Sequence, residues 1–301
     1  MIEASAPGSM MVLGEHSVLR GKHALVLALN KRIYVHLTPN TSATIEIRSG
    51  LGYYHCTLNQ LPNIPLAKPF DYVLQTLKEY PPKDGVSITI KSEMSETMGF
   101  GTSAAVIVAL MGALNALEGK GQDLKMLFDA SKAVIHALCH VGSGADLAAS
   151  VWGGFGLYRM HPFLYEPYTC SLPFFWSYSG FKTPTPKVIR HVAEQFFGKM
   201  DILQALDSTH DALVNHALSC LHHPKEVGAL MNQASGIMES LGVHTKALSR
   251  FLWSLREQSY GVKFSGSGLG DCAIGITKDG FSMAHMHPVD IAPSGLIVKK
   301  K

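Results

Sequence analysis

A glycine-rich stretch that runs directly into an apolar helix most constrains what this chain can fold into. Met98–Ala105 reads Met-Gly-Phe-Gly-Thr-Ser-Ala-Ala, and residues 104–118, rich in alanine and leucine, follow without a proline. We expect Thr102 or Ser103 to cap this helix, because a hydroxyl accepts hydrogen bonds from the free N–H groups of a first turn. Glycine backbone beside a helix start favours an anion, above all phosphate. The alternative is a capped core helix after an ordinary loop.

Composition limits the class of protein. The 301 residues are 47% hydrophobic and 16% charged, which suits a large core and two domains. The net charge is +3 and the dense basic run is Lys299–Lys301, so we expect neither a nucleic-acid nor a membrane partner. We expect no signal peptide and no membrane span, which would need roughly 20 apolar residues in a row.

The cysteines and histidines do not predict a metal site. Five scattered cysteines without a CxxC spacing predict reduced thiols, which are typical of the cytoplasm. The 15 histidines form no HExxH pattern, so we expect most of them to be surface or structural residues.

Hydrophobic periodicity predicts an α+β fold, with strands first, then helices, then strands. The predicted strands cover residues 1–6, 10–13, 23–29, 32–37, 44–48, 53–58, 86–90, 155–159, 174–178, 261–265 and 272–277. The predicted helices cover residues 69–80, 104–118, 124–138, 187–197, 202–220, 225–241 and 246–259. Asn30-Lys31 is interpreted as a hairpin turn. Proline and aromatic residues gather at 161–173, which predicts a domain boundary between residues 165 and 166.

Three clusters of glycine and hydroxyl residues carry the chemistry, at residues 99–103, 142–146 and 265–271. None has the spacing of a Walker loop, and the third lacks the spacing of a dinucleotide-binding loop. Asp146 is a carboxylate among small residues, so it is a candidate for accepting a proton from a substrate hydroxyl. The alternative is that Asp146 caps a helix.

The order of these clusters resembles the GHMP kinases, which include galactokinases and the homoserine, mevalonate and phosphomevalonate kinases. Ala6-Pro7-Gly8 and Gly14-Glu15-His16-Ser17-Val18 resemble the first motif of the family. Gly99–Ala105 resembles its phosphate loop, and residues 142–154 resemble the segment that holds a catalytic aspartate. Residues 182–185 and 265–272 resemble a substrate segment and the third motif, so the resemblance covers nearly the whole chain.

The resemblance implies a two-lobed fold with the active site between the lobes. Residues 1–165 would form a nucleotide-binding lobe like ribosomal protein S5 domain 2, and residues 166–301 a ferredoxin-like lobe. It also implies ATP as the donor, with Mg²⁺, and Asp146 as the base. The residues implied for the phosphates are Gly99, Phe100, Gly101, Thr102, Ser103 and Ala104, with Ser103 also a magnesium ligand. The residues implied for the substrate are Glu15, His16, Thr185, Gly266, Ser267 and Gly268.

Two features depart from the family pattern. Ser9 stands where the family carries a catalytic lysine, which keeps the aspartate ionised. The candidates for replacing that charge are Lys22, Lys91, Lys182 and Arg20. Residues 132–141 contain no acid, whereas mevalonate kinases carry a magnesium-binding glutamate there. We therefore expect the metal to use fewer protein ligands and more water.

The motifs do not agree on the acceptor. Residues 14–21 favour mevalonate, whereas residues 142–146, 179–180 and 270–272 favour phosphomevalonate. We predict a cytoplasmic mevalonate-phosphorylating enzyme of isoprenoid precursor synthesis, because a phosphorylated acceptor needs additional cations in the cleft. The alternatives are a phosphomevalonate kinase and a nucleotide-binding pseudokinase with a regulatory role. RNA binding is disfavoured by the near-neutral charge. We expect a small-molecule substrate and allow for a homodimer.

Overall fold

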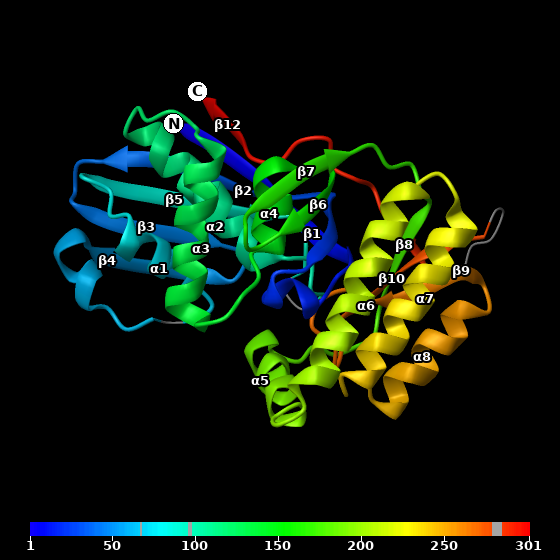
Figure 1. Ribbon diagram of the computed structural model, residues 1–301. Coiled ribbons are helices and arrows are strands. Elements are labelled where there is room, and N and C mark those ends of the chain that lie inside the picture. Colours follow the sequence, from blue (N-terminus) through cyan, green and yellow to red (C-terminus); the bar gives the residue numbers. More distant parts are fainter. Residues whose placement is uncertain (67, 96–97, 279–284) are drawn as a thin grey trace.

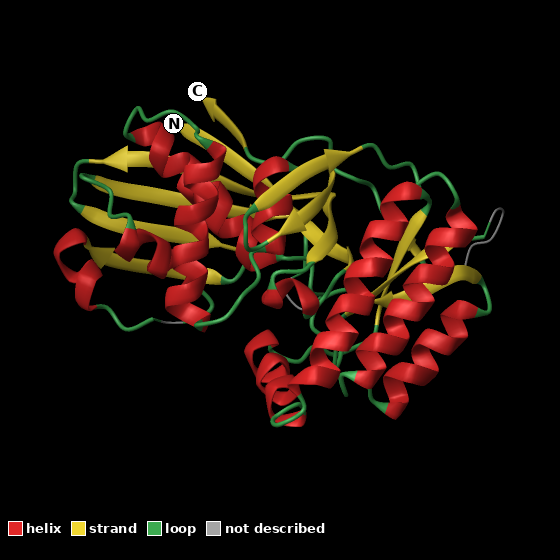
Figure 2. Cartoon of the chain, in the orientation of Figure 1, coloured by secondary structure: helices red, strands yellow, loops and turns green. Residues whose placement is uncertain are grey.

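The computed structural model describes residues 1–66, 68–95, 98–278 and 285–301. Two lobes lie side by side, and each combines a β-sheet with helices that stand in front of it in the view of Figures 1 and 2. The fold is therefore the two-lobed α+β arrangement that the sequence predicts. No helix in the described ranges has an apolar stretch long enough to cross a bilayer.

The first lobe is built on a mixed sheet with the strand order β12-β1-β2-β5-β3-β4, which β6 and β7 continue from β2. β3 runs parallel to β5, whereas β1 pairs antiparallel with both β2 and β12. The strands are β1 (Ile2–Leu13), β2 (His23–Asn40), β3 (Thr44–Ser49), β4 (Gly52–Thr57), β5 (Gly85–Ser92), β6 (Phe155–Arg159), β7 (Leu164–Tyr168) and β12 (Ile297–Lys300).

Helix α2 (Thr102–Leu117) forms the centre of the first lobe. It contacts β1 and β2 on one side and α1 (Asp71–Glu79), α3 (Leu124–Cys139) and α4 (Ala145–Trp152) on the other. Val108 and Leu110 are fully buried, as a helix that is apolar all round requires. This confirms the buried helix that we predicted after the glycine stretch.

The second lobe has a sheet with the order β11-β8-β10-β9. Its strands are β8 (Phe174–Tyr178), β9 (Ser259–Phe264), β10 (Cys272–Thr277) and β11 (His287–Pro288), and its helices are α5 (Thr185–Gln195), α6 (Met200–Ser219), α7 (Pro224–Ser240) and α8 (Lys246–Arg256). α7 lies so close to β9 that a Cβ on Gly261 would sit 1.8 Å from the carbonyl oxygen of Gly228. Two glycines therefore permit this contact between helix and strand.

The predicted hairpin at Asn30-Lys31 is wrong, as is the division of the first strand at Pro7-Gly8. β1 and β2 each run through these positions, and their pairing steps over Asn30 and Lys31 opposite Pro7-Gly8. The N–H of Asn30 donates instead to the carbonyl of Asp290 at 2.8 Å. The two exposed polar residues thus form a bulge within one long strand. A pair of polar residues between two apolar runs is equally compatible with a turn and with a bulge.

The last described strand belongs to the first lobe. β12 pairs with β1 from Ile2–Lys300 to Ser5–Ile297. A Cβ on Gly112 of α2 would lie 2.7 Å from a methyl group of Leu296, so this segment packs against the centre of the lobe. The sheets separate between β7 and β8, close to the boundary predicted at residues 165 and 166, which stays a prediction.

Candidate active site

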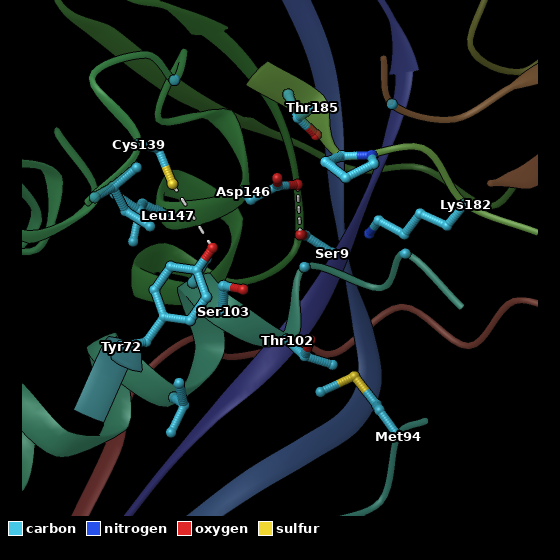
Figure 3. A pocket seen from close by; sticks show the side chains of 18 of the residues that line it. Ser9, Tyr72, Met94, Thr102, Ser103, Cys139, Asp146, Leu147, Lys182 and Thr185 are labelled. Carbon is cyan, nitrogen blue, oxygen red and sulfur yellow. Dashed lines mark hydrogen bonds between the residues drawn. The ribbon is translucent and has the colours of Figure 1, made fainter. Parts of the chain in front are cut away.

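A cleft of about 1210 Å³ lies between the lobes, and all three glycine–hydroxyl clusters contribute residues to its walls. β1, the start of α2 and the start of α4 form one side, and the segment after β8 and the loop after β9 form the other. Figure 3 shows Ser9, Ser103, Asp146, Thr185 and Lys182 around this space. Sequence-distant segments therefore converge on one cleft.

The loop at residues 99–103 presents backbone at the start of α2. Gly99 and Gly101 have φ angles of 70° and 64°, which favour glycine. The N–H of Ser9 donates to the carbonyl of Phe100 at 2.9 Å and so ties the loop to β1. Gly101 is the N-cap, and neither Thr102 nor Ser103 caps the helix, so that prediction is wrong. Both hydroxyl residues lie inside the first turn and border the cleft instead.

Asp146 lies in the first turn of α4 and is exposed to the cleft. The N-cap of α4 is Gly144, so the capping alternative for Asp146 is contradicted. The buried hydroxyl of Ser9 donates to Asp146 Oδ1 at 2.8 Å (Figure 3). This hydrogen bond joins β1 to α4 across the floor of the cleft and orients the carboxylate.

The third cluster contributes unevenly. Ser265, Gly266 and Ser267 border the cleft, and Ser265 Oγ accepts a hydrogen bond from the N–H of Met11 at 2.9 Å. Gly268 is not among the described lining residues, since it packs against Val243.

Phe100 likewise does not border the cleft. It is 2% exposed, and its ring meets Trp176 edge-on at 4.9 Å between centroids. Phe100 thus anchors the loop through its side chain and its carbonyl, while the neighbouring residues Gly99, Gly101, Thr102, Ser103 and Ala104 border the cleft.

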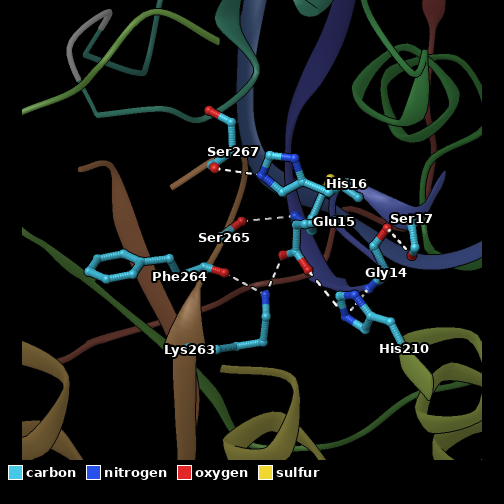
Figure 4. Close-up of polar contacts among 10 residues, drawn as sticks. Gly14, Glu15, His16, Ser17, His210, Lys263, Phe264, Ser265 and Ser267 are labelled. Carbon is cyan, nitrogen blue, oxygen red and sulfur yellow. Dashed lines mark hydrogen bonds and ion pairs between the residues drawn. The ribbon is translucent and has the colours of Figure 1, made fainter. Parts of the chain in front are cut away.

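The predicted substrate residues of the first motif are held by a buried polar network (Figure 4). Glu15 is 1% exposed, and its carboxylate pairs with the ammonium of Lys263, which is fully buried on β9. His16 Nε2 donates to the carbonyl of Ser267 at 2.7 Å. Burial lowers the pKa of His16 to about 4, so the ring is neutral near pH 7. Glu15 therefore positions the turn, whereas His16 presents a neutral ring beside the cleft.

The cleft extends beyond the phosphate loop into a largely apolar recess. Tyr72, Val106, Ile135 and Cys139 border it, and the hydroxyl of Tyr72 lies 3.7 Å from Cys139 Sγ. Burial raises the pKa of Tyr72 to about 12, so its hydroxyl keeps its proton. A recess of this composition beside an anion-binding helix start suits the base of a nucleotide.

Sequence reasoning missed two charged residues, Asp271 at the cleft and Lys263 in the buried network beneath it. Asp271 borders the cleft, and its Oδ2 lies 3.7 Å from the Nζ of Lys182. Asp271 directly follows the third glycine cluster, where a carboxylate could have been recognised as a site residue. Lys263 gives no such signal, because a lysine within an alternating strand is normally read as exposed.

A helix start that attracts anions, a neighbouring apolar recess and an oriented carboxylate in one cleft are the parts of a phosphoryl-transfer site. The family of GHMP kinase N-terminal domains matches residues 68–154, and that of GHMP kinase C-terminal domains matches residues 212–283. The chain belongs to the GHMP kinase family. It is an ATP-dependent kinase that acts on an alcohol.

Individual relatives agree with this assignment. A mevalonate kinase of Pyrococcus abyssi is 29% identical, over 90% of this chain and 87% of the relative. The mevalonate kinase structure of Methanococcus jannaschii has a TM-score of 0.80 at 20% identity, covering 93% of this chain and 91% of the other. A Streptococcus pneumoniae phosphomevalonate kinase structure has a TM-score of 0.79 at 19% identity, covering 96% of this chain and 100% of the other. GHMP kinases named for different acceptors thus share this fold.

Proposed function

We propose that this GHMP kinase transfers the γ-phosphoryl group of ATP to the hydroxyl of mevalonate. The observation that carries the proposal is the Ser9–Asp146 hydrogen bond, which orients a carboxylate in the cleft that the phosphate loop borders. The relatives that are 26% to 29% identical over about nine-tenths of the chain are named mevalonate kinases, which supports this acceptor.

The residues of the cleft account for the reaction. Asp146 accepts the proton of the acceptor hydroxyl, whose oxygen forms a bond to the γ-phosphorus while the bond to the β-phosphate oxygen breaks. N–H groups at the start of α2 stabilise the negative charge on the phosphates. Ser9 holds one oxygen of Asp146, so the other is available to the substrate. Holding both reactants in place can contribute about 7–11 kcal/mol to lowering the barrier.

The donor set at this cleft fits a magnesium ion. Mg²⁺ uses one or two protein oxygens together with phosphate oxygens and water. Ser103 and Asp146 both border the cleft with oxygen ligands, and no group of three or more acidic, histidine or cysteine residues gathers for a metal within the described part of the chain. Ser103 would hold the ion together with phosphate oxygens and water, and the ion when bound would neutralise phosphate charge.

The wall nearest His16 favours mevalonate over phosphomevalonate. Aliphatic and sulfur-containing side chains line it, namely Met10, Met11, Val18, Leu19, Pro184, Pro186 and Ile189. His16 is neutral there because burial holds its pKa at about 4. A phosphorylated acceptor would need additional cations on this wall, and these apolar side chains and a neutral His16 do not supply them.

Specific observations favour two alternative functions. A phosphomevalonate kinase is favoured by Gly270-Asp271-Cys272 and by the similar fold of the Streptococcus pneumoniae protein. A regulatory pseudokinase is favoured by Ser9, which carries no charge where the family has lysine. In the second case ATP would bind, but Asp146 would have no catalytic role. We also propose a cytoplasmic location, and we keep the homodimer as a prediction.

A coupled ADP-release assay with mevalonate, phosphomevalonate, galactose and homoserine tests the proposal. We expect the highest kcat/KM with mevalonate, and Asp146→Asn should lower kcat by about 10²–10⁴. Asp129→Asn is the matched control, because Asp129 lies on α3 with a side chain that is 57% exposed. Faster turnover of another acceptor would overturn the choice of mevalonate. Stabilisation by ATP without any turnover would favour the pseudokinase.

A further inference from the structure

We propose that Lys182, held in place by Asp271, supplies the positive charge at the transferring phosphoryl group. Asp271 is then a positioning residue, and Lys182 is a catalytic residue that touches the substrate. This inference rests on the kinase function of the cleft, but it does not depend on which alcohol is the acceptor.

The backbone around Lys182 is fixed against the third glycine cluster. The N–H of Asp271 donates to the carbonyl of Phe181 at 2.8 Å, and Thr183 Oγ1 donates to the carbonyl of Leu269 at 2.5 Å. A Cβ on Gly270 would lie 2.7 Å from the carbonyl oxygen of Phe181. Lys182 therefore extends from a segment that is anchored on both sides.

The side chain of Lys182 reaches into the cleft. Figure 3 shows it pointing toward Ser9, beside Asp146. Its Nζ lies 3.7 Å from Asp271 Oδ2, and the two side chains are 36% and 8% exposed. The ammonium is thus held on one side by a nearly buried carboxylate, while it remains accessible from the cleft.

Asp271 also contacts the phosphate loop. A Cβ on Gly99 would lie 1.5 Å from Asp271 Oδ1, so the carboxylate packs directly against that glycine. Burial raises the pKa of Asp271, and the charge of Asp146 raises it further, whereas Lys182 lowers it. Two carboxylates therefore act on the same region beside a loop that attracts phosphate, and the Lys182 ammonium next to Asp271 relieves their repulsion.

Other cations are less suitably placed. Among the described residues, the lysines that border the cleft are Lys68, Lys91 and Lys182. Lys68 borders the cleft just before α1, and Lys91 is an exposed residue near the end of β5. Arg20 is engaged by Asp207, with an Nη2–Oδ1 distance of 2.6 Å. Of the four candidates that the sequence offers, Lys182 fits best.

A cation at this point acts on both reactants. It stabilises the negative charge that spreads over the phosphoryl oxygens in the transition state. Its charge also lowers the pKa of the neighbouring Asp271 carboxyl, against the effect of burial. An ammonium supplied from the second lobe would thus do what the lysine of the first motif does elsewhere in the family.

Steady-state kinetics of Lys182→Met, Lys182→Arg and Asp271→Asn test the inference, with Lys225→Met as an exposed control on α7. We expect Lys182→Met to lower kcat at least about 100-fold, with a smaller change in the KM for the acceptor. Lys182→Arg should recover part of this loss. Asp271→Asn should lower kcat less, and Lys182→Met should move the acid side of the pH–rate profile to higher pH.

The inference is overturned if Lys182→Met keeps kcat within about threefold of the parent protein, or if Lys91→Met produces the larger loss. ATP hydrolysis without an acceptor is measured in parallel, and Lys182→Met should lower it too. A parent protein that hydrolyses ATP but phosphorylates no mevalonate would contradict the proposed acceptor alone. A Lys182→Met variant that loses kcat but keeps its pH profile would make the lysine a structural residue and not a catalytic one.

Discussion

The buried ion pair between Lys263 and Glu15 links the lobes and allows a quantitative test of the fold. Lys263 lies on β9 of the second lobe and is 0% exposed, and Glu15 follows β1 of the first lobe and is 1% exposed. The ammonium contacts Glu15 Oε1 and the carbonyl of Phe264 (Figure 4). The other carboxylate oxygen lies 4.0 Å from His210 Nε2. Each of these two buried charges is therefore compensated by the other.

We expect Lys263→Met to lower the free energy of unfolding by about 3–5 kcal/mol, because it leaves a buried carboxylate without its counter-charge. At about 2–4 °C per kcal/mol, this corresponds to a fall of roughly 10 °C in Tm. The loss should be smaller at low pH, where an unpaired buried carboxylate takes up a proton. The double variant Lys263→Met/Glu15→Gln should recover at least half of the loss, since it buries no charge.

Urea unfolding followed by tryptophan fluorescence measures the four species of this double-mutant cycle, with Lys225→Met as the exposed control. A coupling free energy of about 2 kcal/mol or more between positions 15 and 263 is expected. The reasoning is refuted if Lys263→Met unfolds within about 1 kcal/mol of the parent protein. It is equally refuted if the double variant is no more stable than the less stable single variant.

Three further predictions concern the loop, the buried histidines and the recess. Gly99→Ala should raise the KM for ATP at least about tenfold, because the residue has a φ of 70° and its Cβ would overlap Asp271; Gly121→Ala, with nothing within 4 Å, is the control. Burial lowers the pKa of His210 to about 3 from 6.5, so the unfolded chain binds protons first on acidification. His210 alone should therefore lower the stability from pH 6.5 downward by up to about 1.4 kcal/mol per pH unit, and His16, whose pKa is also lowered by burial, adds to this fall. Urea unfolding measures it, and equal stability at pH 7 and pH 5 would contradict it. ATP should slow alkylation of Cys139, which borders the recess, while the buried Cys272 stays unreactive with or without ATP because burial raises its pKa; mass spectrometry of the labelled peptides measures both.

Local patterns predicted the parts of the site that depend on short stretches of sequence. The strand 155–159, the strand 272–277 and the helix after Gly101 depend on periodicity and glycine placement, and the structure confirms them. The convergence of the three clusters was predicted from their order and from the family resemblance. The cleft confirms it, although Phe100 and Gly268 are absent from its described lining.

Features that depend on long-range packing were not predictable in this way. Whether Asn30-Lys31 turns or bulges is decided by the hydrogen bond to Asp290, which lies far away in the sequence. The caps of α2 and α4 are glycines with φ angles of 64° and 81°, and the hydroxyl and carboxylate residues that follow them border the cleft. Likewise, no local pattern distinguishes Lys182 from the other candidate cations, since its position depends on contacts with the third cluster.

The position of β12 affects how this protein folds during synthesis and where the chain can be truncated. During synthesis, the edge of β1 that β12 covers stays without a partner until the entire second lobe has emerged from the ribosome. A fragment that ends at residue 165 would expose that edge and would remove Leu296 and Val298 from the surface of α2. We therefore expect such a fragment to aggregate. A fragment that carries residues 285–301 on a linker should aggregate less.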